Sequence, residues 1–176
     1  MPSGRGETRL RICNELNIND DNLIMVTGGK LDKKKNIINL IDAIERLDCH
    51  HIKFIIFGSL SDDIKEDVEK RVNTDHIKYV GWVNPNKIYD YLMCADLAVF
   101  PGLHSVLWEQ AVACGIPCIF SDIKGFHHVD TGGNCAFLKD SSPMEIEALI
   151  KRVLFGEGVL QSMRQNAIHG ARQFLY

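Results

Sequence analysis

The amino-acid sequence predicts an α/β fold, a doubly wound parallel sheet with helices on both faces. Short apolar segments that end at turn residues alternate with amphipathic helical segments along almost the whole chain. This is the order expected when each strand of a parallel sheet is followed by a crossover helix. The 176 residues are 45% hydrophobic and 24% charged, as in an ordinary globular domain with a core of its own.

The first half of the chain is expected to hold three strand–helix pairs. They are, in order, a strand at residues 23–27, a helix at 36–47, a strand at 52–57, a helix at 61–72, a strand at 77–80 and a helix at 85–94. The strands are apolar runs followed by Gly28, Gly58 and Gly81, which interrupt regular structure. The first helix has apolar residues at helical spacing, the second begins at the capping residue Ser61, and the third has Pro85 in its first turn.

The second half of the chain continues the alternation. It is expected to hold a strand at 97–100, a helix between Ser105 and Gly115, a strand at 117–120, a loop at 124–134, a strand at 136–138 and helices at 141–154 and 159–174. Residues 1–6 are rich in glycine and are expected to form a linker, and residues 7–16 a leading helix. We therefore expect a linker and leading helix over residues 1–21 and a binding domain over residues 22–176.

Composition argues against several functional classes. The formal net charge is -3, and there is no basic face with interleaved aromatic residues, so no nucleic-acid partner is expected. No apolar run has the length of a transmembrane helix. The six cysteines lack zinc-site spacing, and the adjacent residues of Cys49-His50-His51 point in different directions, so no metal site is expected. Such free cysteines are typical of a reduced, cytoplasmic protein.

The carboxyl ends of the predicted strands should meet at one edge of the sheet, where ligands bind in this fold class. The helix that begins at Ser105 would present free N–H groups and the positive end of its dipole there, and phosphate is the usual ligand of such a terminus. Glu109 and Gln110 lie about one turn into this helix, near enough to reach a sugar hydroxyl beside the phosphate. His104 lies in the turn itself and is a candidate contact for phosphate or substrate.

A second candidate segment follows the first strand. The glycine pair at Gly28 and Gly29 permits a tight turn, and Lys30 and Lys35 are placed to close on a diphosphate as point charges. Cations at the start of a helix are mildly unfavourable, which favours an anionic ligand over a solvated charge run. The segment has neither the G-K-[ST] of a P-loop nor G-x-G-x-x-G.

Three segments together carry a family resemblance. Residues 29–35 are similar to a G-R-L…K segment with Lys30 in place of arginine, residues 95–101 to A-D-x-x-x-x-P, and residues 110–117 to E-A-M-A-x-G-x-P. The chain thus resembles the C-terminal, nucleotide-sugar-binding half of retaining GT-B glycosyltransferases of the glycosyl transferases group 1 type. The resemblance implies a Rossmann-like half of a GT-B fold.

The resemblance also implies roles for matching residues. Lys30 and Lys35, after Gly29, would neutralise the diphosphate of a UDP- or GDP-type donor. The backbone around His104 and Ser105 would meet the distal phosphate. No metal is implied, because the two cations and the helix dipole replace it, and no cofactor is implied besides the nucleotide-sugar substrate.

The chain departs from the family pattern at the acidic positions. The family's ribose-binding glutamate aligns with Gln110, so either Gln110 binds the ribose or a small shift of register lets Glu109 do so. A second family glutamate, which contacts the donor sugar, aligns with Gly102. His104 is the hypothesised substitute and hence the candidate catalytic residue. His128 stands where another glutamate is common.

The leading expectation is a donor-binding domain of a glycosyltransferase in polysaccharide biosynthesis. Its acceptor, a sugar or a lipid-linked acceptor, would be held by an N-terminal domain absent from the chain, so the chain alone should be inactive. The full-length protein would be cytoplasmic or peripheral to the membrane. The alternatives are a non-catalytic sugar-nucleotide-binding or regulatory module, and a receiver-type domain, which would need an acidic pocket where this chain has lysines.

Overall fold

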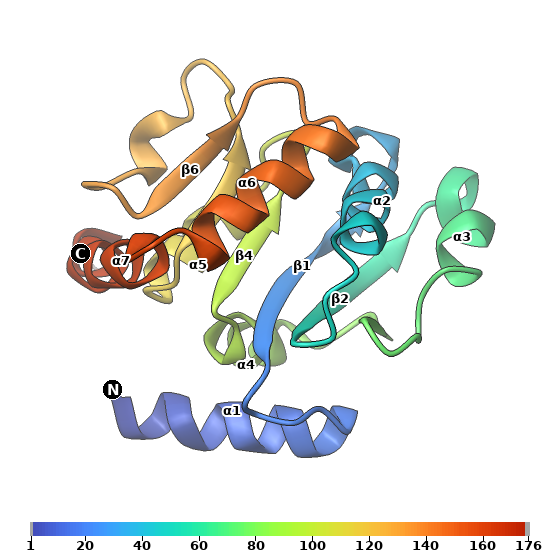
Figure 1. Ribbon diagram of the computed structural model, residues 1–176, viewed down its shortest axis with the longest axis horizontal. Helices are drawn as coiled ribbons and strands as arrows, with labels where there is room; N and C mark the ends of the chain where they lie inside the picture. Colours follow the sequence, from blue (N-terminus) through green and yellow to red (C-terminus); the bar gives the residue numbers. More distant parts are fainter. Residues whose placement is uncertain (1, 175–176) are drawn as a thin grey trace.

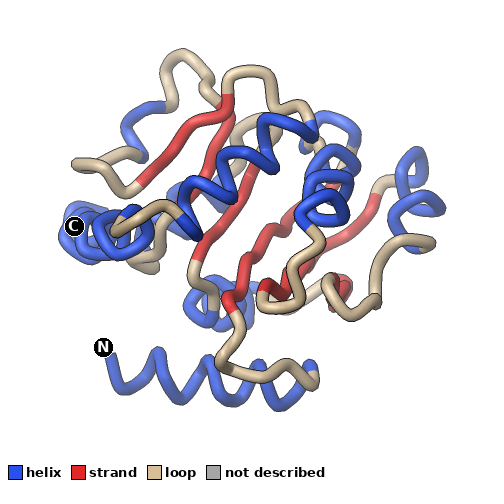
Figure 2. Tube along the Cα trace, viewed as in Figure 1, coloured by secondary structure: helices blue, strands red, loops and turns tan. Residues whose placement is uncertain are grey.

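The computed structural model describes residues 2–174, which form one parallel six-stranded sheet with helices around it (Figures 1 and 2). The strands are β1 (Leu23–Leu31), β2 (Ile52–Leu60), β3 (Ile77–Gly81), β4 (Leu97–Phe100), β5 (Cys118–Ser121) and β6 (Cys135–Leu138). Their spatial order is β3-β2-β1-β4-β5-β6, and all neighbouring strands pair in parallel. Strands β1 to β3 are added toward one edge of the sheet and β4 to β6 toward the other, so the strand order reverses between β1 and β4. This fold class binds ligands at such a point.

Helices cover both faces of the sheet, so the predicted doubly wound α/β fold is confirmed. The helices are α1 (Pro2–Leu16), α2 (Ile37–Leu47), α3 (Asp62–Glu69), α4 (Pro85–Cys94), α5 (Val106–Ala113), α6 (Pro143–Phe155) and α7 (Val159–Phe174), with short 3-10 helices η1 (Lys33–Lys35) and η2 (His127–Val129). In Figure 1, α2 and α6 lie in front of the sheet and α4 lies behind it. None of the helices in residues 2–174 is long and apolar enough to cross a membrane.

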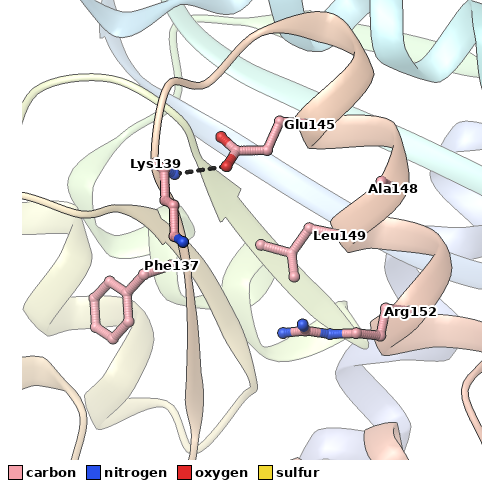
Figure 3. Close-up of a pocket in the computed structure, with 6 residues that line it drawn as sticks. All are labelled: Phe137, Lys139, Glu145, Ala148, Leu149 and Arg152. Atoms are coloured by element: carbon pink, nitrogen blue, oxygen red, sulfur yellow. Dashed lines mark hydrogen bonds between the residues drawn. The ribbon is translucent and has the colours of Figure 1, made fainter.

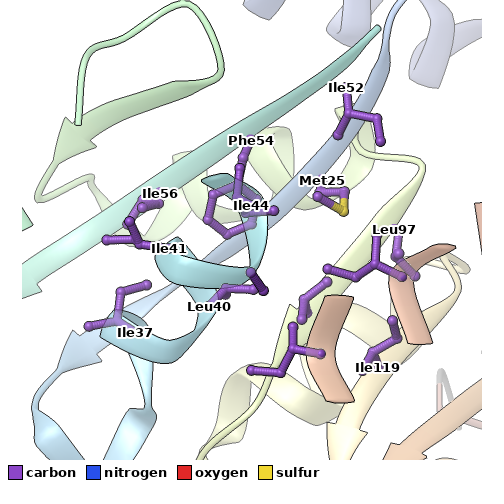
Figure 4. Close-up of a cluster of buried hydrophobic side chains, with 14 of the residues drawn as sticks. Met25, Ile37, Leu40, Ile41, Ile44, Ile52, Phe54, Ile56, Leu97 and Ile119 are labelled. Atoms are coloured by element: carbon purple, nitrogen blue, oxygen red, sulfur yellow. The ribbon is translucent and has the colours of Figure 1, made fainter. Parts of the chain in front are cut away.

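The two faces of the sheet make two separate hydrophobic clusters because successive residues of a strand point to opposite sides. Met25 and Phe54 face Leu40 of α2 in the first cluster, which also receives side chains from α3 and α6 (Figure 4). On the other face, strand residues pack with side chains of α1, α4 and α5. There the fully buried Trp108 of α5 stacks on Phe120 of β5, with ring centroids 4.3 Å apart. The start of α5 is thereby fixed to the sheet.

Helix α1 begins at Pro2, so the expected linker over residues 1–6 was wrong for the described residues 2–6. The reason is tertiary: Arg5 Nη2 donates to the carbonyl of Ala95 (2.9 Å) and Arg9 Nη1 to the carbonyl of Cys94 (2.7 Å). These carbonyls end α4 and would otherwise lack partners. The bonds outweigh the low helix propensity of the glycines, and α1 lies beside α4 (Figure 1). The expected domain division after residue 21 stays a prediction.

Strands β1 and β2 extend further than predicted, through the glycines that were expected to end them. The ladder continues from Gly29↔Gly58 to Leu31↔Leu60. At this pair the two backbones approach closely: a Cβ built on Gly58 would lie 1.9 Å from the carbonyl oxygen of Gly29. Glycine here allows the strands to pass each other without ending either one.

The connection between β6 and α6 is held by a single carboxylate (Figure 3). Glu145 accepts hydrogen bonds from the N–H groups of Lys139 (2.8 Å), Asp140 (2.9 Å) and Ser141 (2.8 Å). Ser142 caps α6 by accepting from the N–H of Glu145 (3.2 Å), and the N–H of Ser142 donates to the carboxylate of Asp140 (2.9 Å). Together these bonds fix the start of α6, which lies within the helix predicted at residues 141–154.

All six cysteines are free thiols. Burial raises the pKa of Cys94 to about 12 and that of Cys114 to about 11. High thiol pKa values keep these groups protonated and unreactive near neutral pH. These thiols act as small apolar residues of the core.

We expect Gly58→Ala to lower the free energy of unfolding by about 4 kcal/mol or more, because its Cβ would collide with rigid backbone. Gly132→Ala is the matched control: its φ of 114° is nearly the 115° of Gly58, but no atom lies within 4 Å of its Cβ. That variant should lose only about 1–2 kcal/mol from left-handed strain. Urea denaturation measures both, and equal losses would show that the close approach has no energetic weight.

Candidate functional site

The connection that follows β1 and the connection that follows β4 meet at the carboxyl edge of the sheet. The N–H of Leu103 donates to the carbonyl of Lys34 (3.0 Å), and Asn36 Nδ2 donates to the carbonyl of Pro101 (2.9 Å). Lys35 Nζ lies 3.4 Å from the carbonyl oxygen of His104. These bonds place the predicted residues Lys35 and His104 side by side although they are far apart in sequence.

Gly102 lies at the closest contact between these connections. A Cβ on Gly102 would lie 2.3 Å from Cα of Lys35 and 2.4 Å from the carbonyl oxygen of Lys34. Both neighbours are backbone atoms, which cannot rotate away. The position where the resemblance expects a glutamate therefore has no room for any side chain.

The start of α5 faces this junction with free backbone donors. Ser105 caps the helix: its Oγ accepts from the N–H of Leu107 (3.3 Å) and its carbonyl from the N–H of Trp108 (3.0 Å). Within residues 2–174, the N–H groups of His104, Ser105 and Val106 have no protein partner. The hollow between β1 and β4 has a volume of only about 10 Å³, room for about one water molecule, so an anion held by these donors would lie above the hollow.

Glu109 is held between two imidazoles from different loops. His104 Nε2 lies 2.7 Å and 3.0 Å from its two carboxylate oxygens, and His128 Nε2 lies 3.0 Å from Oε1. A carboxylate only accepts hydrogen bonds, so both imidazoles present Nε2–H to Glu109. The Glu109 side chain is 28% exposed and that of His104 24%. The group is therefore fixed in place and still accessible from solvent.

Aromatic rings set the orientation of His104. Its ring stacks on Phe126 with centroids 4.2 Å apart and meets the edge of Trp108 at 5.2 Å. Phe126 belongs to the loop after β5, and Trp108 is immobilised in the core. Four ring and carboxylate contacts thus restrain the imidazole, which favours a role that needs a fixed direction.

The remaining predicted residues lie around this group with different contacts. Gly29 adjoins the start of α5, since a Cβ built on it would lie 2.8 Å from Leu107. Lys30 is exposed beside Ser59 at the end of β2 and takes no part in the hydrogen bonds that hold Lys35 to the turn. The amide oxygen of Gln110 is buried and has no hydrogen-bond partner within residues 2–174. The structure therefore brings Lys35, His104, Ser105 and Glu109 together more closely than Lys30 and Gln110.

Sequence reasoning missed two residues of this group. His128 was noted only as standing where a glutamate is common in the family, and Asn36 was not considered as a partner of the turn. The signal for His128 was its alignment with a position where the related family carries glutamate. No signal in the sequence identified Asn36, because its role depends on a left-handed backbone at φ 58° that turns its side chain toward Pro101.

A separate cluster at the opposite, amino edge contains potential metal ligands. His50, Asp75 and His76 offer ligand atoms within 4.8 Å of one another, whereas Cys49 and His51 are not part of the cluster. Lys53 Nζ already lies 3.2 Å from the carboxylate of Asp75 and competes with a cation for it. The expectation of no metal stays a prediction.

Comparison with known proteins decides the family. The family model described as glycosyl transferases group 1 matches residues 9–173. The chain belongs to this glycosyltransferase family. The expected group 1 resemblance and the Rossmann-like fold are thereby confirmed.

Relatives and solved structures agree with this assignment. A Bacillus subtilis protein named for a proposed role as a teichuronic acid biosynthesis glycosyltransferase, TuaC, is 32% identical over 69% of this chain and 30% of its own length. An uncharacterized glycosyltransferase of Methanocaldococcus jannaschii is 25% identical over 92% of this chain and 43% of its own length. The crystal structure of Anabaena Alr3699/HepE in complex with UDP and glucose superposes with a TM-score of 0.77 at 16% identity, over 95% of this chain and 48% of that one. The chain thus spans less than half the length of these proteins.

We expect Gly102→Ala to lower the free energy of unfolding by about 3 kcal/mol, because the added methyl group must push the Lys34–Lys35 backbone away. The control is Leu103→Ala in the same turn, where the side chain is 52% exposed and the loss should stay within about 0.5 kcal/mol. Thermal or urea unfolding distinguishes them. An unchanged stability for Gly102→Ala would mean that the two connections are not in contact.

Proposed function

We propose that this chain is the donor-binding domain of a retaining GT-B glycosyltransferase and binds a nucleotide-diphosphate sugar at the junction of β1, β4 and α5. The observation that carries the proposal is the convergence of three kinds of group at one place. They are the free N–H groups at the start of α5, the ammonium group of Lys35, and the carboxylate of Glu109 between two histidines.

The diphosphate is assigned to the start of α5. Free N–H groups and the helix dipole attract an anion there, and Lys35 Nζ lies against the same turn with only long contacts of 3.4 and 3.5 Å to carbonyl oxygens. A phosphate oxygen is a stronger partner for the ammonium group than these carbonyls. Lys30 is exposed near the end of β1 and adds positive charge at longer range. In this proposal the two lysines and the helix dipole supply the positive charge that a metal ion supplies in metal-dependent diphosphate sites.

Of the two candidates for the ribose contact, we assign Glu109. Its carboxylate is partly exposed at the edge where the diphosphate would lie. The amide oxygen of Gln110 is shielded from solvent, so Gln110 would have to change its side-chain conformation to meet a ligand. The carboxylate also has lone pairs to spare after accepting from both imidazoles.

His104 is proposed to contact the donor sugar in place of the missing glutamate. With Nε2–H directed to Glu109, a neutral imidazole keeps Nδ1 as an acceptor. An acceptor is what a sugar hydroxyl needs, and it is also what a glutamate at position 102 would have offered. The stacking on Phe126 fixes the plane in which that acceptor lies.

The acceptor of the transferred sugar is proposed to bind to a second domain. The relatives, of which this chain spans 30–43%, are long enough to contain one. The name of TuaC and the position of a Klebsiella pneumoniae relative in a cps region favour a role in polysaccharide assembly. The free cysteines favour a reducing compartment, and we place the full-length enzyme in the cytoplasm, at the membrane surface where a lipid-linked acceptor would lie.

One observation favours a second candidate, a sugar-nucleotide-binding module without catalytic activity. The position of the donor-sugar glutamate is closed at Gly102, and a module that only binds nucleotide could lose that contact without penalty. The two candidates agree on nucleotide binding and differ on transfer.

Lys35→Ala should weaken binding of UDP or GDP by about 10–100-fold, the loss expected for a charge-assisted contact with phosphate. Lys33→Ala, which removes an equal charge from the same 3-10 helix, is the control and should change affinity little. Calorimetry at low and high salt measures both, with weaker binding expected at high salt. A well-folded chain that binds no nucleoside diphosphate would rule out both candidate functions.

In the full-length enzyme, His104→Ala should lower turnover by about 10²-fold while leaving UDP affinity nearly unchanged, because the proposed contact is to the sugar. His127→Ala is the control: its exposed imidazole lies in the same loop as His128 but bonds to Asp122. A radiolabelled-sugar transfer assay reports the difference. Unchanged turnover in His104→Ala would remove this residue from the catalytic group, and no transfer by the wild-type enzyme with any donor that it binds would favour the non-catalytic module.

A further inference from the structure

A second basic hollow lies at the amino edge of the sheet, opposite the proposed donor site. It is lined by Arg5, Arg9, Asp96, Gly115, Arg164 and Ile168. Asp96 immediately precedes β4, and the arginines come from α1 and α7. The hollow has a volume of about 230 Å³, smaller than the roughly 300–1,000 Å³ of pockets that hold whole organic ligands.

Asp96 is nearly buried, and both of its carboxylate oxygens already accept hydrogen bonds from the protein. One carboxylate oxygen, Oδ2, accepts from the N–H of Ile24 (2.9 Å) and from Arg9 Nη1 (3.1 Å). The other oxygen accepts from Arg164. The Asp96 side chain is 12% exposed. Asp96 is therefore a structural anion that organises the hollow and neutralises one of its three guanidinium groups.

The arginines have unequal numbers of free donors. Arg9 also donates to the carbonyls of Cys94, Asp20 and Asn22, so most of its five N–H groups are used. In contrast, within residues 2–174 Arg5 makes one hydrogen bond, to Ala95, and Arg164 makes one, to Asp96. Arg164 is 42% exposed. Two guanidinium groups that line the hollow thus keep most of their donors free of protein partners within residues 2–174.

Charge in the hollow is unbalanced. Three guanidinium groups face one carboxylate, a surplus of two positive charges at a partly buried site. Burial lowers the pKa of Arg5; the charge of Asp96 opposes that effect, and the charges of Arg164 and Arg9 add to it. An anion in the hollow would relieve this repulsion.

We propose that this hollow is a binding site for a phosphate group, held by Arg5 and Arg164 with Asp96 and Arg9 as its fixed base. The planar fork of each guanidinium group matches two oxygens of a phosphate. A dianion balances the surplus charge, and the volume suits a phosphate better than a nucleotide. The phosphate comes either from a free phosphate ion or from the headgroup of a lipid with a terminal phosphate.

The test uses the 176-residue chain with Lys35→Ala as background, so that phosphate binding at the proposed donor site is weakened and equal in all variants. Inorganic phosphate is titrated by calorimetry, and phosphatidylcholine vesicles with and without phosphatidic acid are tested by co-sedimentation. We expect binding to at least one probe. Arg5→Ala and Arg164→Ala should each weaken it about tenfold or more, the effect of losing one charge-assisted fork.

The matched control is Arg172→Ala, which removes an equal, exposed charge from the same helix as Arg164. It should bind as the background does. Arg164→Lys keeps the charge but loses the fork and should give an intermediate affinity, which guards against a loss caused by misfolding. Binding to phosphatidic acid vesicles alone identifies lipid phosphate as the ligand, and binding to free phosphate alone identifies a soluble one. No binding to either probe, or binding that Arg5→Ala and Arg164→Ala leave unchanged, overturns the proposal.

Discussion

The contact between the backbone at Gly102 and the backbone at Lys34 and Lys35 is the constraint on which the candidate site depends. It joins the connection after β1 to the connection after β4, across the point where the order of the strands reverses. Hydrogen bonds from Leu103 and Asn36 reinforce it on both sides. Because the backbones touch, the ammonium group of Lys35 lies against the start of α5. A longer turn or a larger residue at position 102 would separate the cation from the helix terminus, the two parts of the proposed diphosphate site.

The same constraint leaves no room for a side chain at position 102, where the family resemblance expects a glutamate. A glutamate at position 102 would need space that the Lys35 backbone occupies. Glu109, further along the same segment, is held in place by His104 and His128. The edge that would receive the nucleotide carries fewer negative charges than the family pattern, because Gly102 and Gln110 stand where that pattern has glutamates. That balance favours a polyanionic ligand over a neutral sugar held by carboxylates.

The order of strands and helices could be predicted from the sequence because each element carries its own signal. Helix α4 and strand β4 have the predicted bounds, set by Pro85 and by the break at Pro101. The extension of β1 and β2 could not be predicted, since glycine is an equally good sign of a strand's end and of two backbones in close contact. Helix α1 was missed at its start because its stability comes from Arg5 and Arg9 bonding to α4, and local propensity contains no such information.

The candidate site was predictable in its location and less so in its contacts. The fold class places Lys35, Ser105 and Glu109 at one edge of the sheet, which follows from topology alone. Which side chains touch depends on rotamers and on loops, and these are fixed only by packing.

His104 bonds to Glu109 because Phe126, from a loop after another strand, stacks against its imidazole. His128 comes from the same loop, so one segment both orients His104 and completes the pair of donors to Glu109. Since neither histidine is on α5 itself, a movement of the loop after β5 would change the direction of both imidazoles together. The arrangement of Glu109, His104 and His128 therefore depends on the connections after β1, β4 and β5 together. The sequence pattern of α5 alone could not have predicted it.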